Sequence, residues 1–266
     1  MNHIFLSPHM DDAVLSCGGL IAQLVQAGDS VTVFTLMAGA VPPDAPMTPF
    51  INEHFVRWAM VPDPVLGRHA EDRQSVTSLG GTLQLGDIPD ALYRTNGLGV
   101  PFYPDLDRLF GAIHPHDPAV TRAAALIAAL DPAATIYAPL GAGHHVDHQV
   151  VRKAVVDWLK LQSQITTQRA AQVAVFFYEE YPYSADDTTQ IVQTARDAFG
   201  HATHPVLHYL SEAALDAKIN AIACYRSQIS TFWDDIPAMA AATRRYAMQV
   251  GEGTYAERLW QYSRQK

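Results

Sequence analysis

The first 37 residues form a pattern that restricts the chain to a small group of folds. A short apolar segment at 3–6 is followed by helical apolar spacing over 12–26 and by a β-branched, nearly continuous apolar run over 30–37. A strand that is apolar on both faces is typical of a parallel sheet covered by helices. This strand, helix and strand therefore predict a βαβ unit with a right-handed crossover.

The rest of the chain continues this alternation. Further strands are expected at 82–85, 135–138 and 173–178, and 204–209 has the alternation of an antiparallel edge strand. No internal repeat, low-complexity tract or linker interrupts the sequence, although its elements are less regular after about residue 185. We therefore predict a single α/β domain over residues 1–266, with a mostly parallel sheet flanked by helices.

Composition and charge argue against several functional classes. Hydrophobic residues make up 48% of the chain, enough for a sizeable core, and the formal net charge is −9 with histidine neutral. The absence of a Lys/Arg run argues against nucleic acid and anionic membranes as main partners. No stretch reaches the ~18–20 apolar residues of a membrane span, and Cys17 and Cys224 form no metal-binding spacing. A soluble cytoplasmic protein is expected, and a homo-oligomer is compatible with the sequence.

A cluster of metal-ligating residue types lies between the first strand and the first helix. His9, Asp11 and Asp12 follow the strand within the segment LSPHMDD. In α/β proteins this junction is at the carboxyl edge of the sheet, where ligands usually bind. An Asp pair at a helix start is more often a simple helix cap, and Asp12 is a candidate for that role. This cluster alone is therefore weak evidence for a metal site.

A second cluster lies at an equivalent junction far along the chain. His144, His145, Asp147 and His148 follow the predicted strand 135–138 and open the next helix. Because the carboxyl ends of parallel strands share one edge, the two clusters should meet there. A histidine pair three residues apart is usually a surface feature when it occurs alone. The joint pattern instead predicts one shared metal site.

The two clusters together contain the parts of a hydrolytic metal site. Catalytic zinc commonly takes three protein ligands and leaves one position for water, whose pKa falls to about 7. The candidate ligands are His9, Asp12 and His148. Asp11 is the candidate general base for the zinc-bound water that acts as nucleophile, and His145 is free to stabilise an oxyanion or to protonate a leaving amine.

Other residues are candidates for substrate contacts or for orienting a metal ligand. Arg68 has the alternative of a surface pairing with Glu71 or Asp72. The four candidates of this kind are Arg68, Asp90, Arg94 and Asp147. Aromatic residues after position 85 either stack on a sugar or anchor a loop, namely Tyr93, Phe102 and Tyr103. Five further histidines are expected to be solvated, namely His114, His116, His201, His204 and His208.

These motifs closely resemble those of the LmbE-like, or PIG-L, family of zinc-dependent N-acetylglucosaminyl deacetylases. The family's His-Pro-Asp-Asp motif corresponds to residues 9–12, with a small-residue segment at 17–19 behind it, and its His-x-Asp-His motif to residues 145–148. Further matches follow in the same order: Arg-x-x-Glu at 68–71, Leu-Gly at 79–80, a Tyr-Glu-Asp-x-Pro-like segment at 178–182, Lys218, and Tyr-x-Ser-Gln at 225–228.

The resemblance implies a Rossmann-like fold without a dinucleotide, and no Gly-x-Gly-x-x-Gly follows the first strand. Two departures from the family pattern, Met10 for Pro and Ala13 for a frequent Glu, remove no ligand. The roles that the resemblance implies are zinc ligation by His9, Asp12 and His148, proton abstraction by Asp11, and assistance to the tetrahedral intermediate by His145.

The expected activity is removal of the N-acetyl group from an N-acetylglucosamine-type sugar or conjugate. One alternative is an amidase of the same family that cleaves a larger acyl group from a sugar–thiol conjugate. Another is a sugar-binding module with a vestigial site, which the retention of every ligand and of the base disfavours. Fe²⁺ or another divalent ion could occupy the same donors in place of Zn²⁺, because affinity alone does not select the metal.

Overall fold

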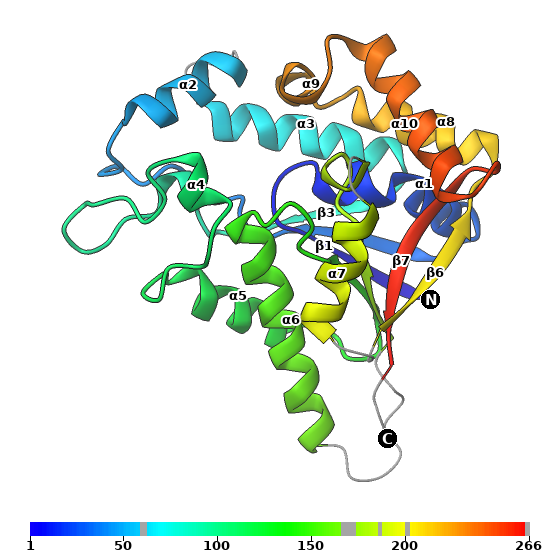
Figure 1. The fold of residues 1–266 in the computed structure, drawn as a ribbon, viewed down its shortest axis with the longest axis horizontal. Helices are drawn as coiled ribbons and strands as arrows, with labels where there is room; N and C mark the ends of the chain where they lie inside the picture. The colour runs from blue at the N-terminus through cyan, green and yellow to red at the C-terminus, as the bar shows by residue number, and fades with distance from the viewer. Residues whose placement is uncertain (59–62, 166–173, 186–187, 200–202, 264–266) are drawn as a thin grey trace.

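The centre of the protein is a seven-stranded sheet in the order β3-β2-β1-β4-β5-β7-β6 (Figure 1). The computed structural model describes all residues except 59–62, 166–173, 186–187, 200–202 and 264–266. The strands are β1 (Asn2–Ser7), β2 (Ser30–Thr35), β3 (Thr82–Leu85), β4 (Thr135–Pro139), β5 (Val175–Tyr178), β6 (Thr203–Tyr209) and β7 (Ala256–Tyr262). Residue 173, at the start of the predicted strand 173–178, lies outside the described residues.

Helices and two short 3-10 turns connect these strands. The helices are α1 (Asp12–Gln26), α2 (Pro49–Trp58), α3 (Pro64–Ser78), α4 (Leu106–Leu109), α5 (Ala119–Ala128), α6 (Val146–Ile165), α7 (Thr188–Phe199), α8 (Glu212–Ile222), α9 (Arg226–Phe232) and α10 (Ile236–Val250). The turns are η1 (Ala91–Tyr93) and η2 (Tyr183–Ala185). None of the described helices is long and apolar enough to cross a membrane.

β1 lies at the centre of the parallel part of the sheet. It pairs in parallel with β2 and with β4, so that Phe5 lies opposite both Val33 and Tyr137. The parallel pairing continues to β3 on one side and to β5 on the other. The predicted α/β fold with a mostly parallel sheet is confirmed. Because the strand order reverses between β1 and β4, the crevice at that point is where such folds bind ligands.

The sheet ends in two antiparallel strands. β7 is inserted between β5 and β6 and runs antiparallel to both. The predicted antiparallel edge strand at 204–209 is confirmed as β6. The sequence did not predict β7, whose buried Trp260 donates a hydrogen bond to the carboxylate of Glu179 just after β5. The partner that makes this segment a strand lies far away in the sequence.

Helices cover both faces of the sheet. Successive side chains of a strand point to opposite faces, so Phe5 and Leu6 belong to different core clusters. Phe5 packs with residues of α1, α8 and α10, whereas Leu6 packs with residues of α5, α6 and α7. The sheet therefore lies between two helical layers, as expected for this class of fold.

Two glycines allow α1 to pack closely against its neighbours. A Cβ atom at Gly18 would lie 2.9 Å from Cγ of Lys218, and one at Gly19 would lie 2.5 Å from Cδ1 of Leu210. Gly costs up to about 1 kcal/mol in a helix, and this close approach explains its presence twice. Both contacts come from the same neighbour. Lys218 lies in α8, which packs along α1, and Leu210 lies just before the cap residue of α8.

A third core cluster lies outside the two helical layers. It joins Trp58 of α2, Val65 of α3 and Leu109 of α4 to Leu92 and to Val146, the first residue of α6. Figure 1 shows α2 and α4 on the same side of the molecule. Since Val146 stands within the second histidine motif, this cluster holds α2 and α4 next to the predicted site.

Candidate metal centre

A tight turn after β1 fixes His9 and Asp12 relative to each other. The hydroxyl of Ser7 donates to the carbonyl of His9 at 2.6 Å and accepts from the backbone N–H of Ala13 at 3.0 Å. The N–H of His9 donates to Oδ2 of Asp12 at 2.8 Å. Asp12 is the first residue of α1, and its side chain is not a helix cap. The carboxylate instead faces back toward His9.

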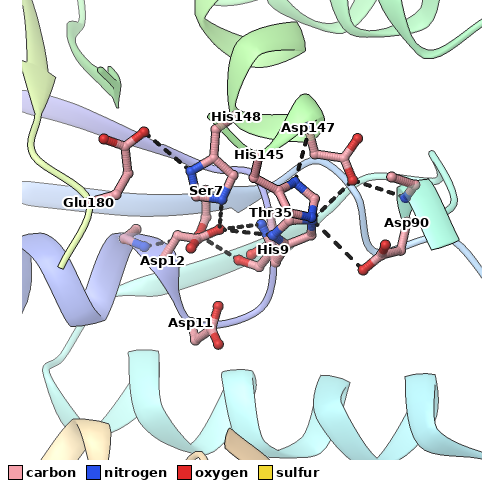
Figure 2. A network of polar contacts seen from close by, with 12 residues as sticks. Ser7, His9, Asp11, Asp12, Thr35, Asp90, His145, Asp147, His148 and Glu180 are labelled. Carbon is pink, nitrogen blue, oxygen red and sulfur yellow. Dashed lines mark hydrogen bonds and ion pairs between the residues drawn. The ribbon is translucent and has the colours of Figure 1, made fainter. Parts of the chain in front are cut away.

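The two sequence clusters meet at the carboxylate of Asp12. Its Oδ2 lies 3.3 Å from Nδ1 of His9 and 3.3 Å from Nε2 of His148 (Figure 2). His9 follows β1, and His148 lies in the first turn of α6, which follows β4. All three side chains are buried. The predicted meeting of the two clusters at one sheet edge is thus observed.

Each of these two imidazoles has a buried carboxylate behind it. Nε2 of His9 lies 3.0 Å from Oδ2 of Asp147, and Nδ1 of His148 lies 3.2 Å from Oε1 of Glu180. When these nitrogens donate, the opposite nitrogen of each ring presents its lone pair toward Asp12. Carboxylate–histidine pairs of this kind orient the histidines of metal sites. The donor set therefore fits a divalent metal ion.

Glu180 is a part of the site that the sequence analysis did not identify. Its carboxylate accepts the backbone N–H groups of Gly141 and Ala142 in addition to facing His148. It thus connects the segment after β5 to the loop after β4. The signal that points to it is its position directly after a strand of the parallel sheet, the same signal that identified His9.

Asp147 is held by a buried network on its far side. Oδ1 lies 2.6 Å from Nη2 of Arg94, and Oδ2 accepts the N–H of Ala91 at 3.0 Å. Arg94 also donates through Nε and Nη2 to Asp117, which accepts the hydroxyl of Tyr103 at 2.7 Å. Arg94 does not line the cavity. Of the two predicted roles for Arg94, the contacts favour orienting the site over contacting the substrate.

Two groups of metal-ligating atoms occur among the described residues. The first is His9, His145 and His148, and the second is His9, Asp90 and Asp147. Neither group contains His114, His116, His144, His204 or His208, and His201 lies outside the described residues. In the second group, Asp147 is already ion-paired with Arg94, and Asp90 lies 3.7 Å from His9.

The charges at the site are arranged to attract a cation. Burial opposes protonation of His148, but Asp12 and Glu180 raise the pKa of its imidazole to about 9. Burial likewise opposes protonation of His9, and Asp90, Asp12 and Asp147 together raise its pKa well above its usual value. Burial would raise the pKa of Asp12, but the two histidines lower it strongly. These carboxylates stabilise a positive charge on the imidazole rings, and a bound metal cation would replace the protons that carry this charge.

Asp11 and Arg68 lie side by side next to the metal centre. Nη2 of Arg68 is 3.8 Å from Oδ2 of Asp11, and the guanidinium carbon lies 4.9 Å from the centre of the Trp58 ring. Burial and the neighbouring Asp12 raise the pKa of Asp11 to about 7, against the opposing effect of Arg68. Arg68 is thus buried beside Asp11 and is not a surface partner of Glu71 or Asp72.

A cavity of about 140 Å³ opens above these residues. Of the predicted site residues, it is lined by His9, Asp11, Asp12, Arg68, Asp90 and His145. The aromatic residues Tyr93, Phe102 and Tyr103 are buried and do not line it. They anchor their segment, since the Phe102 ring packs 4.5 Å from that of His114 and the Tyr103 hydroxyl binds Asp117.

Comparison with known proteins gives relatives over most of the chain. The family model described as PIG-L: GlcNAc-PI de-N-acetylase matches residues 4–159. The 2'-N-acetylparomamine deacetylase of Niallia circulans is 29% identical over 199 residues, which cover 68% of this chain. The match spans 66% of that relative's own length, slightly less than two thirds.

Solved structures share the fold over the whole chain. The zinc-inhibited form of teicoplanin deacetylase Orf2 has a TM-score of 0.80 at 23% identity, covering 100% of this chain and 99% of that chain. The A40926 pseudoaglycone deacetylase Dbv21 has a TM-score of 0.73 at 24% identity, covering 98% of each chain. Because the family model matches more than half of the chain, and its motif residues meet in one buried site, the protein belongs to the PIG-L family.

Proposed function

We propose that the protein is a metal-dependent hydrolase that removes the N-acetyl group from an N-acetylated amino sugar or its conjugate. The observation that carries this proposal is the convergence of His9, His148 and Asp12, with a buried carboxylate behind each imidazole. Membership of a family described as de-N-acetylases and the deacetylase names of the relatives support the same reaction. The amino-sugar substrate is carried over from these relatives.

His9, Asp12 and His148 are the proposed ligands, and zinc is the proposed metal. The alternative third ligand is His145, which lies within reach of the two other histidines. Asp12 fits better because its Oδ2 lies 3.3 Å from both ring nitrogens, whereas Nδ1 of His145 accepts the N–H of Asp147 at 3.2 Å. Asp12 also brings a negative charge to the divalent cation. Fe²⁺ would satisfy the same donors.

Asp11 is the proposed general base. A divalent metal bound at this site would supply a water of lowered pKa and polarise the acetamide carbonyl. Asp11 accepts the proton of the attacking water at a carboxylate oxygen and delivers it to the departing amine nitrogen, so that acetate and a free amino sugar result. Burial and the neighbouring Asp12 raise the pKa of this carboxyl to about 7 in the metal-free protein, and a carboxyl near neutral pH can both take up and release a proton. Arg68 holds this carboxylate in place at 3.8 Å.

His145 is the proposed donor to the oxyanion of the reaction. Because its Nδ1 accepts the N–H of Asp147, the neutral ring carries its proton on Nε2. Burial and then the charge of His9 lower the pKa of His145 well below its usual value. The ring also packs edge-on against Phe110 at 5.2 Å. A fixed N–H that lines the cavity can stabilise charge that develops on the carbonyl oxygen.

Acetate release and metal content, measured together, test this proposal. Wild type loaded with Zn²⁺ or Fe²⁺ should release acetate from N-acetylglucosamine conjugates, and activity should stop on chelation and return with added metal. Asp11→Asn should keep one metal per chain but lose at least about 10²-fold in kcat. His148→Ala should lose the metal itself. A wild type that binds no divalent metal, or whose activity survives chelation, would contradict the mechanism.

The acyl group separates the deacetylase from the amidase of a sugar–thiol conjugate. Release of acetate from N-acetylglucosamine itself would favour the deacetylase, whereas turnover confined to larger acyl groups on a thiol conjugate would favour the amidase. A cytoplasmic location, a possible self-association and the absence of nucleic-acid binding also stay predictions. Cell fractionation, sedimentation and a nucleic-acid binding assay would test them.

A further inference from the structure

The cavity above the metal centre is too small to enclose a whole sugar conjugate. Its volume is about 140 Å³, compared with roughly 300–1,000 Å³ for typical small-molecule sites. Its floor is polar and is formed by His9, Asp11, Asp12 and His145. The acetamido end of the sugar must reach this floor to react. The remainder of a conjugate must therefore lie against the residues at the entrance.

Part of the lining consists of apolar side chains that are not fully buried. Three of these residues, which we call the rim, come from α4, the residue after α4, and α9, namely Leu106, Phe110 and Phe232. The side chain of Leu106 is 57% exposed, and an exposed apolar surface at a concave site often marks binding. The rings of Phe110 and Phe232 both contact Tyr183, at 6.3 and 5.7 Å between ring centres. All three rings line the cavity.

The charged residues around the cavity are unevenly distributed. The acidic residues that line it in the described part of the chain are Asp11, Asp12 and Asp90, which lie beside the metal centre. Arg57 also lines the cavity and is exposed, and no described residue forms an ion pair with it. A conjugate with several ammonium groups would meet the like charge of Arg57 and, among the described lining residues, would find carboxylates only beside the metal centre.

We propose that the rim binds an uncharged aromatic or apolar group attached to the amino sugar, and that polycationic conjugates are disfavoured. This inference rests on the proposed deacetylation at the same site. Burying a flat aromatic group against Leu106, Phe110 and Phe232 removes apolar surface of both partners from water. The rim thereby selects among amino-sugar conjugates that present the same acetamido group to the metal centre.

Three substrates with the same reacting group test the preference. They are N-acetylglucosamine, its 2-naphthyl β-glycoside, and 2'-N-acetylparomamine, whose second ring carries ammonium groups. With metal-loaded enzyme, we expect kcat/KM for the naphthyl glycoside to exceed that for the free sugar at least tenfold, mainly through KM. We expect the paromamine derivative to be the poorest of the three. A paromamine derivative that is turned over best would overturn the proposal.

A matched pair of variants tests the rim directly. Leu106→Asp places a carboxylate on the rim and should lower the naphthyl-to-free-sugar ratio of kcat/KM at least tenfold. Leu98→Asp introduces the same charge at a residue that is 88% exposed and does not line the cavity, and it should leave the ratio unchanged. Equal ratios in wild type and Leu106→Asp, or the same drop in both variants, would refute a role for the rim.

Binding measurements separate this inference from the proposed function. If none of the three compounds releases acetate, the proposed deacetylation fails. Calorimetric titration of the metal-loaded protein with the same compounds then still tests the rim. Tighter binding of the naphthyl glycoside than of the free sugar, lost in Leu106→Asp and kept in Leu98→Asp, would support it. Equal or weaker binding would overturn it.

Discussion

Oδ2 of Asp147 lies 3.0 Å from Nε2 of His9, and through this contact a residue of α6 sets the orientation of a residue that follows β1 (Figure 2). Asp147 is fully buried, and Arg94 holds its other oxygen. Burial would raise the pKa of Asp147, but Arg94 and His9 lower it strongly. The carboxylate is therefore charged when it fixes the ring.

Asp147→Asn should weaken metal binding without removing a proposed ligand. The amide keeps the shape of the side chain but loses the charge that orients His9 and increases its basicity. Loss of such a partner typically costs about 10–100-fold in metal affinity. Competition with a chelating dye measures the affinity. Asp157→Asn in the same helix removes only surface pairs with Lys153 and Lys160 and should have no effect. Equal affinities of the two variants would count against the contact.

Asp117→Asn should destabilise the fold and also weaken metal binding indirectly. The substitution removes the charge that holds Arg94 at 2.8 Å and leaves a buried guanidinium with one carboxylate partner. Breaking a buried pair by changing one partner costs about 3–5 kcal/mol. Urea denaturation of the metal-free protein measures this loss. Asp87→Asn breaks an exposed pair with Arg122 and should cost less than about 1 kcal/mol. A similar loss in both variants would disprove the role of the buried network.

Asp11→Asn should stabilise the metal-free protein at alkaline pH although it lowers the activity of the metal-loaded enzyme. Burial and Asp12 raise the pKa of Asp11 to about 7 in the folded protein, above its value of about 3.9 in the unfolded chain. Stability from this group is then complete below the unfolded pKa and is lost as pH rises through about 7. We expect the Tm of the variant at pH 8 to exceed that of wild type by at least about 2–4 °C, equivalent to about 1 kcal/mol.

The pH dependence separates this effect from a general change in stability. The difference in Tm between Asp11→Asn and wild type should shrink as pH falls from 8 toward 4, since Asp11 is then neutral in wild type as well. Scans in the presence of a chelator keep both proteins metal-free. A constant difference at all pH values would show that the unfavourable charge of Asp11 is not its cause.

Metal removal should lower the stability of the wild type because the proposed ligands would connect the turn after β1 to α6 through the metal. Binding to the folded state alone contributes about 2.7 kcal/mol at a metal concentration 100-fold above Kd. Addition of Zn²⁺ to chelated wild type should therefore raise Tm by several degrees. His148→Ala should show no such increase, whereas His116→Ala, which changes an exposed loop histidine, should respond as wild type does. A metal-dependent shift retained in His148→Ala would exclude His148 as a ligand.

Several features followed from local sequence. The apolar run at 30–37 and the helical spacing before it predict a parallel sheet because each strand must be covered on both faces. His9 and His148 could be assigned to one edge because each lies just beyond a strand of that sheet. A residue's position relative to its own strand depends on neighbouring residues, so the sequence by itself specifies this.

The partners of these residues depend on the tertiary structure. Glu180 lies behind His148 because β5 is the neighbour of β4, and Asp117 holds Arg94 because the chain between β3 and α5 folds back on itself. β7 is a strand because β5 and β6 flank it. Such contacts join residues that are distant in the sequence, and their energies depend on burial and mutual geometry. The sequence by itself therefore determined the fold class and led to the proposed reacting groups, whereas the tertiary structure decided how these side chains are oriented and charged.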